Sequence, residues 1–118
     1  MNEPHVVDNR DDLPLALHHR LDDTPLTIWA FRVYAHLVRR TGRKGKAWPS
    51  YKSIGEHCFR ATLQTASAAT LRRRAIEAIN ELKAAGLIAV EQRTREDGGD
   101  TSNVYRLTPY RSWKIARG

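Results

Sequence analysis

Three consecutive arginines, Arg72, Arg73 and Arg74, are the residues of this 118-residue chain whose type and spacing most directly suggest a chemistry. They stand near the start of TLRRRAIEAINELKAAGLI, residues 70–88, a segment with the pattern of a helix. Positive charges at a helix N-terminus repel one another and oppose the helix dipole, at a cost of about 0.3–1 kcal/mol each. A guanidinium can donate two hydrogen bonds to guanine O6 and N7, or pair with phosphates. The unfavourable turn therefore predicts a surface that binds a polyanion.

The helix that must position these arginines is predicted from its apolar pattern. Five apolar residues recur at helical spacing within one narrow arc, namely Leu71, Ala75, Ala78, Ile79 and Leu82. With that arc buried, Arg73 is expected to point away from the core, with Arg72 and Arg74 on either side. Gly86 is placed to end the helix as a C′ residue.

Two further helices are predicted upstream. The first, over about residues 28–38, carries two apolar stripes and is expected to be buried on more than one side. These stripes are Ile28, Phe31, Ala35 and Val38, and Trp29, Val33, Tyr34 and Leu37. The second helix, about residues 51–59, is short and places Ile54 and Cys58 on its core side. Residues able to cap the three helices are Thr24 or Thr27, Ser50, and Ser67 or Thr70.

After the third helix the apolar period changes to two, which predicts a β-hairpin. The two strands are LIAVEQRTR and SNVYRL, separated by the turn signal EDGGD. Ile88 and Val90 share one face of the first strand, and Tyr105 and Leu107 are expected on the matching face of the second. Three helices followed by a hairpin predict an α+β fold that is mainly α.

The formal net charge of +7 is concentrated in the middle of the chain. Residues 1–23 carry a net −4, residues 24–76 a net +10 and residues 77–118 a net +1. The middle segment holds eleven Lys or Arg against a single acid, Glu56. A surface that serves only solubility would not need acids excluded from one continuous segment, so this distribution favours a nucleic-acid-binding face.

Several other classes of protein are disfavoured by the sequence. No apolar run approaches the about 20 residues that span a bilayer, and MNEPHVVDNRDD lacks the order of a signal peptide. A single cysteine, Cys58, provides no disulfide framework and no thiolate metal cluster. The histidines His18, His19, His36 and His57 match neither a zinc site nor a hydrolase order. We expect a cytoplasmic protein that is not an enzyme and that needs no cofactor, metal or small-molecule ligand.

The segments WPSYKSIGEHC, TLRRRAIEAINELKAAGLI and TSNVYRL, taken in this order, resemble the winged helix-turn-helix domains of bacterial, phage and plasmid DNA-binding proteins. The resemblance covers about residues 26–108. It implies a three-helix bundle with a C-terminal β-hairpin wing, and a third helix, starting near Thr70, that reads the major groove. The link FRATLQTASAAT departs from the family by being longer than the usual tight turn. The implied organisation is an acidic arm at 1–23, the domain at 24–108 and a basic tail at 109–118.

Within this frame ten residues are candidate DNA contacts: Lys52, Arg60, Ser67, Thr70, Arg72, Arg73, Arg74, Arg93, Arg95 and Asn103. Arg73 is expected to meet a base edge, while its two neighbours meet phosphates. Lys52 is equally well explained by an ion pair with Glu56, four residues away. In the wing, Thr101 and Ser102 join the candidates, but the acidic tip EDGGD would be repelled by DNA.

A second basic cluster precedes the second helix and consists of Arg39, Arg40, Arg43, Lys44 and Lys46. In the resembled fold this link lies away from the third helix. Contact with flanking DNA backbone and a simple solubility role explain it equally well.

These observations predict a sequence-specific double-stranded DNA-binding protein, a small transcriptional regulator that represses by occupying an operator. One domain of this size reads few base pairs, so we expect a homodimer on half-sites about 34–36 Å apart. Candidate dimer contacts are the apolar patch LPLALHHRL and the tail around Trp113. One alternative is a plasmid or phage replication-initiation or partition protein on origin repeats, and another is a winged-helix protein-interaction module.

Overall fold

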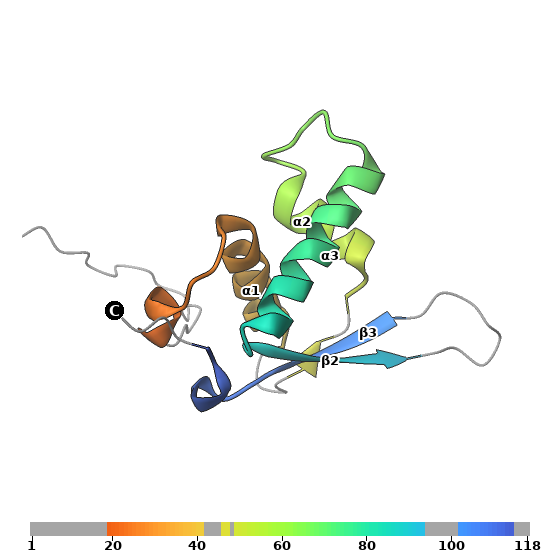
Figure 1. Cartoon of the computed structure of the whole chain (residues 1–118). Helices are drawn as coiled ribbons and strands as arrows, with labels where there is room; N and C mark the ends of the chain where they lie inside the picture. Colours follow the sequence, from red (N-terminus) through yellow and green to blue (C-terminus); the bar gives the residue numbers. More distant parts are fainter. Residues whose placement is uncertain (1–18, 42–45, 48, 94–101, 115–118) are drawn as a thin grey trace, which may run out of the picture.

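The structure is a computed structural model that describes residues 19–41, 46–47, 49–93 and 102–114. The described residues form an α+β arrangement that is mainly helical. Its elements are η1 (His19–Asp23), α1 (Ile28–Thr41), β1 (Lys46–Ala47), α2 (Tyr51–Phe59), α3 (Ala68–Ala84), β2 (Ile88–Arg93), β3 (Ser102–Leu107) and η3 (Tyr110–Ser112). The three α-helices pack together, and the hairpin of β2 and β3 extends away beneath them (Figure 1). No helix in the described part of the chain is long and apolar enough to cross a membrane.

Each α-helix begins at a hydroxyl cap. The caps are Thr27 for α1, Ser50 for α2 and Ser67 for α3, whose Oγ atoms accept the backbone N–H three residues on at 3.2, 3.0 and 3.1 Å. The cap predicted at Ser50 is therefore confirmed. Of the paired alternatives, Thr27 caps rather than Thr24, and Ser67 caps rather than Thr70. As a result α3 begins two residues before Thr70, inside the segment read from the sequence as a link.

The end of α3 confirms the prediction made for Gly86, which has a φ of 82°. The N–H of Leu87 donates to the carbonyl of Leu82 at 3.0 Å, and the N–H of Gly86 donates to Lys83 at 3.0 Å. This pair of bonds is a Schellman motif, in which a residue without a Cβ adopts the left-handed conformation most easily. It turns the chain directly into β2.

The core lies between the helices and the inner face of the hairpin. Its largest fully buried side chains are Tyr105, Phe59, Leu37, Ile54, Leu71, Ile79, Leu82, Leu87 and Val33. The buried residues of α3 are the five of the predicted arc. Cys58 is buried as an apolar group, as expected, and burial raises the pKa of its thiol to about 11.

The burial predicted for α1 is only half right. Ala30, Val33, Tyr34 and Leu37 are buried, so the second predicted stripe faces the core. The first stripe is covered unevenly, because Val38 packs against the core whereas Ile28 is 76% exposed and Phe31 is 38% exposed. The helix is therefore apolar on a side that the rest of the described chain leaves uncovered.

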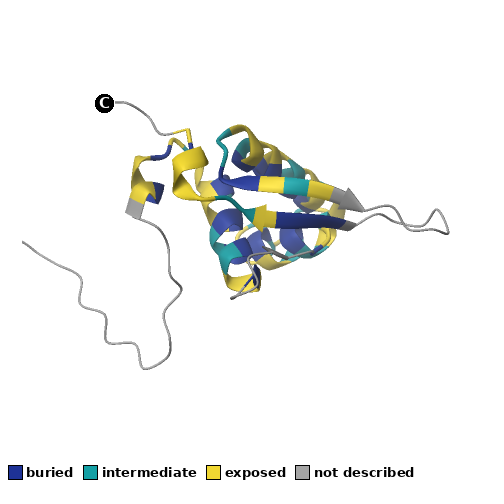
Figure 2. Ribbon diagram, turned by 90° about the horizontal axis from the view of Figure 1, so that it is seen from below, coloured by how far each residue is buried: buried dark blue, intermediate teal, exposed yellow. Residues whose placement is uncertain are grey.

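The sheet is antiparallel with the order β1-β3-β2, and β1 contributes only two residues. In the hairpin Ile88 pairs with Leu107 and Val90 with Tyr105, so these four residues share one face, as the alternating pattern predicted. Figure 2 shows the hairpin lying across the helices, with buried residues in both strands. Tyr105, fully buried, carries the sheet into the helical core.

The residues after β3 pack back on the domain. Trp113 is 7% exposed and meets Tyr34 edge-to-face, with ring centroids 5.7 Å apart. Its Nε1 donates to the carbonyl of Thr108 at 3.3 Å, and the N–H of Lys114 donates to Ala85 at 2.8 Å. Trp113 is thus occupied within its own chain, and the expectation that it contacts a second copy is not carried forward.

The first turn of α1 is tied to α3 by a carboxylate. Glu81 accepts hydrogen bonds from the backbone N–H of Thr27 at 2.7 Å and from its Oγ1 at 2.8 Å. A negative charge at a helix N-terminus also complements the helix dipole. This contact fixes the position of α1 against the second half of α3.

Gly55 allows the closest approach between α2 and α3. A Cβ built at Gly55 would lie 2.6 Å from the carbonyl oxygen of Leu71 and 2.8 Å from its carbon. These are backbone atoms at the start of α3, which cannot move aside as a flexible side chain would. The absence of a side chain at Gly55 therefore sets the distance between the two helices.

We predict that Gly55→Ala destabilises the protein by about 1–3 kcal/mol, because the added methyl forces the helices apart. In an exposed helix the same change would stabilise by about 1 kcal/mol, so the sign of the effect is diagnostic. Urea unfolding monitored by circular dichroism gives the free energy. Lys52→Ala, at an exposed position of α2, is the matched control and should stay within about 0.5 kcal/mol. A Gly55→Ala protein as stable as the wild type would contradict the close approach.

Candidate functional site

Arg73 lies on the side of α3 that faces away from the core, as predicted from the buried arc. Its side chain is 69% exposed. Its one ion pair among the described residues joins its Nε to Oε1 of Glu77 at 3.9 Å, and the side chain of Glu77 is itself 65% exposed. A pair of this length between exposed side chains stabilises by about 0.3–0.5 kcal/mol and is screened by salt. Such a contact is readily exchanged for a stronger acceptor, so Arg73 is available to a ligand.

Arg72 is also exposed but is oriented by an aromatic ring. Its guanidinium carbon lies 5.6 Å from the ring centroid of Tyr51, the first residue of α2. A cation over the face of a tyrosine ring is attracted by the electrons of the ring. The contact places Arg72 beside the start of α2, where the following residue, Lys52, is exposed.

The sequence pattern placed Arg74 on the exposed side of α3, beside Arg73. In the structure its side chain instead turns toward α1. Its guanidinium carbon is 4.3 Å from the ring centroid of Trp29 in α1, and the residue is half-buried. Its Nε is buried and has no hydrogen-bond partner among the described residues. Arg74 therefore packs α3 against α1, and its side chain covers Trp29.

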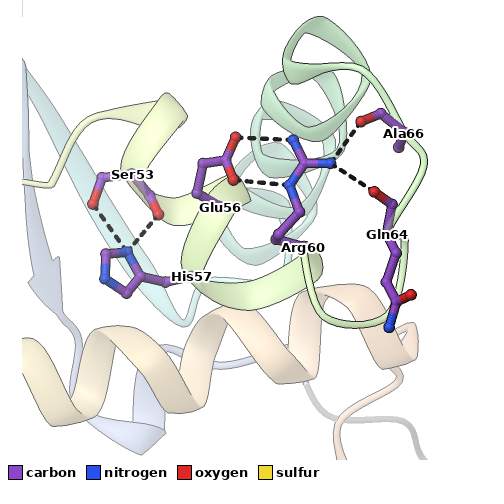
Figure 3. A network of polar contacts seen from close by, with 6 residues as sticks. All are labelled: Ser53, Glu56, His57, Arg60, Gln64 and Ala66. Carbon is purple, nitrogen blue, oxygen red and sulfur yellow. Dashed lines mark hydrogen bonds and ion pairs between the residues drawn. The ribbon is translucent and has the colours of Figure 1, made fainter.

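Arg60 is engaged by the protein itself. Its Nε and Nη2 donate to the two carboxylate oxygens of Glu56 at 3.0 and 3.1 Å. Its Nη1 donates to the carbonyls of Gln64 at 3.2 Å and Ala66 at 2.7 Å (Figure 3). Hydrogen bonds from Arg60 lower the pKa of the Glu56 carboxyl, so this arrangement persists at neutral pH. Arg60 thus holds the loop that leads into α3.

This arrangement also answers the question left open for Lys52. Both oxygens of Glu56 are occupied by Arg60, so within the described residues Glu56 pairs with Arg60 and not with Lys52. Lys52 remains an exposed cation in the first turn of α2. Lys52, Arg72 and Arg73 together are called the outer face below.

Ser67 and Thr70 are used at the start of α3. The Oγ of Ser67 accepts the backbone N–H of Thr70 at 3.1 Å and donates to Thr70 Oγ1 at 3.0 Å. Ser67 is exposed and Thr70 is half-buried. Their first role is structural, since they fix the turn on which the arginines stand, and the hydroxyl of Thr70 keeps a proton to donate.

The hairpin residues divide into described and undescribed ones. Asn103 is 9% exposed and its Nδ2 donates to the hydroxyl of Tyr105 at 3.2 Å, so it faces the protein. Arg93 is paired with Ser102 in the strand register, but the side chains of these two residues are not described. Arg95 and Thr101 lie wholly outside the described residues. Asn103 is therefore set aside as a ligand contact, and the others stay predictions.

Of the second basic cluster only Arg39 and Arg40 have described side chains, and both are exposed in the last turn of α1. The remaining members, Arg43, Lys44 and Lys46, lie outside the described residues or have undescribed side chains. The two explanations given for this cluster are thus both retained.

A stacked pair of histidines was not foreseen. His36 in α1 and His57 in α2 have ring centroids 5.5 Å apart and an interplanar angle of 24°. His36 is buried, and its Nε2 has no hydrogen-bond partner among the described residues. Burial, His57 and then Arg40, Arg32 and Arg39 lower the pKa of His36 to about 4. No local sequence signal joins two histidines 21 positions apart; only the packing of α1 on α2 does so.

The described residues contain no group of three or more His, Cys, Asp or Glu side chains that could hold a metal ion. No family model matches the chain, and no curated protein or solved structure is similar enough to count as a match. Lys52, Arg72 and Arg73 are exposed cations at the starts of α2 and α3.

We predict that Arg60→Met lowers the thermal midpoint of unfolding, because the carboxylate and two carbonyls lose their common donor. Hydrogen exchange should accelerate first at the amides of residues 60–67. Lys52→Met, which removes a cation with no bond to this loop, is the matched control and should leave both measurements unchanged. An Arg60→Met protein with wild-type exchange in this loop would show that Arg60 does not hold it.

Burial of His36 predicts a loss of stability in acid. The unfolded chain protonates this histidine below about pH 6.5, whereas the folded chain keeps it neutral down to about pH 4. Stability should therefore fall by on the order of 1–3 kcal/mol between these values. Urea unfolding at pH 7, 5.5 and 4 measures the loss. His36→Gln should remove most of it, while His57→Gln should retain most of it; equal slopes in all three proteins would refute the assignment.

Proposed function

We propose that the protein is a winged helix-turn-helix protein that binds double-stranded DNA in a sequence-specific way, with α3 in the major groove. The element order supports this, since α1, β1, α2 and α3 are followed by the antiparallel hairpin of β2 and β3. The observation that carries the proposal is the exposure of Arg72 and Arg73 at the start of α3. In this class of protein the N-terminal residues of the third helix meet base edges.

In the proposed complex one residue of the outer face contacts a base and the other two contact the DNA backbone. Arg73 points straight out from α3 and donates to a base edge, with guanine O6 and N7 as the matching acceptors. Arg72, held beside Tyr51, and Lys52 at the start of α2 lie to one side and neutralise phosphates. Each phosphate contact releases a counterion, so affinity falls as salt rises.

Other candidates act by positioning the reading helix. Arg60 holds the loop before α3, Ser67 caps the N-terminus of α3, and Arg74 packs α3 against Trp29. The arginines of the wing, Arg93 and Arg95, are kept in the proposal as phosphate contacts of the flanks of the hairpin. The outer face thus makes the direct contacts with DNA, and Arg60, Ser67 and Arg74 hold α3 in position for them.

The biological role proposed is transcriptional regulation in the cytoplasm, with repression by occupying an operator as a homodimer. The alternative is replication initiation or partition on origin repeats, which uses the same DNA contacts. Footprints on tandem repeats, in place of one palindrome, would favour the alternative. A protein-interaction module is the third possibility, and it predicts no salt-dependent affinity for duplex DNA.

Selection of bound duplexes from a random pool identifies the cognate site, after which Arg73→Ala tests the proposed contact. We expect affinity for the cognate duplex to fall by about 1–3 kcal/mol and preference at one base pair to relax. Affinity for random DNA should change far less. Arg111→Ala, an exposed arginine of η3, is the matched control and should leave specificity unchanged.

Two results would count against the proposal. No enrichment from the random pool would remove sequence-specific binding. An Arg73→Ala protein with intact preference at every base pair would show that the start of α3 does not read the site.

A further inference from the structure

The uncovered side of α1 forms an apolar hollow. It has a volume of about 390 Å³ and is lined by Leu26, Thr27, Ile28, Phe31, Arg32 and Ala35. Ile28 and Ala35, seven residues apart, lie opposite the buried Val33 and Leu37. Single exposed apolar residues are ordinary, but a contiguous apolar hollow marks a contact surface. Nothing in the proposed DNA contacts uses this side of the helix.

We propose that this hollow binds the same hollow of a second copy, with the two α1 helices antiparallel across a two-fold axis. An isologous interface must be self-complementary in shape. Here a large exposed side chain, Ile28, stands at one end of the hollow and a small one, Ala35, at the other. Antiparallel packing brings Ile28 of one copy over Ala35 of the other, so that each protrusion fills the opposite recess.

Arg32 does not oppose this contact. Its Nη2 donates to the carbonyl of His57 at 3.2 Å, which turns the guanidinium toward α2. The two Arg32 charges are thereby held to the sides of the axis, and their aliphatic stems widen the apolar surface.

Charge complementarity selects the second copy and its direction. Asp22 and Asp23 are exposed just before α1, and Arg39 and Arg40 are exposed in its last turn. Antiparallel packing brings the exposed Asp22 and Asp23 of one copy toward the last turn of α1 of the other, twice by symmetry. In that turn Arg39 lies on the same stripe of the helix as Ile28 and Ala35. A parallel arrangement would place acids against acids and arginines against arginines, which is unfavourable.

This interface would form the homodimer of the proposed function. Only its role in binding two DNA half-sites rests on that proposed function. Trp29, which meets Arg74 of α3, does not line the hollow, so the hollow lies on another side of α1 than the contact with Arg74. A dimer formed here leaves both outer faces open for two half-sites. One helix face is smaller than the roughly 800 Å² per partner of a standard interface, so the free dimer is weak and DNA strengthens it.

Sedimentation of the full chain over a range of concentrations tests the contact. The wild type should self-associate, and Ile28→Glu should raise the dissociation constant of the dimer at least about tenfold. Ala84→Glu, which places the same charge at an exposed position of α3, should not change it. Wild-type protein that stays monomeric both alone and on a duplex with two sites overturns the proposal, and so does equal self-association of both variants. A hollow occupied by the chain's own first 18 residues, or by another protein, would give that monomeric result.

A charge exchange tests the antiparallel direction. Asp23→Arg and Arg39→Asp should each weaken self-association, and the protein carrying both changes should recover it. Failure of the double variant to recover overturns the antiparallel arrangement. A duplex with one half-site separates this inference from the proposed function: Ile28→Glu should bind it with wild-type affinity. A wild type that dimerises but binds no duplex would refute the proposed function and leave the interface standing.

Discussion

The approach of α2 to α3 at Gly55 is the constraint on which the rest of the structure depends. With no Cβ at this position, the backbone of α2 meets the backbone of α3 at Leu71, one residue before the arginines. The direction of α3, and with it the direction of Arg73, is therefore set by a contact between main chains. Main-chain contacts tolerate less adjustment than side-chain packing, because no rotamer change relieves a clash.

The four bonds of Arg60 complete this constraint from the other end. Gly55 allows α2 and α3 to approach closely, and Arg60 holds the loop that joins the two helices. Both devices concern the geometry of the connection between α2 and α3, residues 60–67, which is longer than a tight turn. A longer connection has more conformations available, and a buried contact together with a shared donor reduces them.

Sequence reasoning predicted the elements well where local chemistry decides them. The hydroxyl caps, Gly86 and the two-residue period of the hairpin all act within a few positions, and the shared face of Ile88 and Leu107 follows from that period. It failed where a side chain has a partner within the protein that the apolar pattern does not reveal, whether that partner is far along the chain or only a few residues away. Arg74 is drawn to Trp29, Arg60 to Glu56 and to two carbonyls, and Asn103 to Tyr105. The same limit applies to α1, since two apolar stripes do not reveal which one the core will cover.

The stacking of Arg74 on Trp29 has a kinetic consequence. A guanidinium over an aromatic ring keeps its full charge, so Arg74 still adds to the positive potential around the start of α3 although it is not free to grip a ligand. Long-range attraction depends on the summed charge, whereas residence time depends on the contacts made at the surface. On this protein, capture of a polyanion by diffusion would draw on all three arginines, and release would be governed by the exposed two.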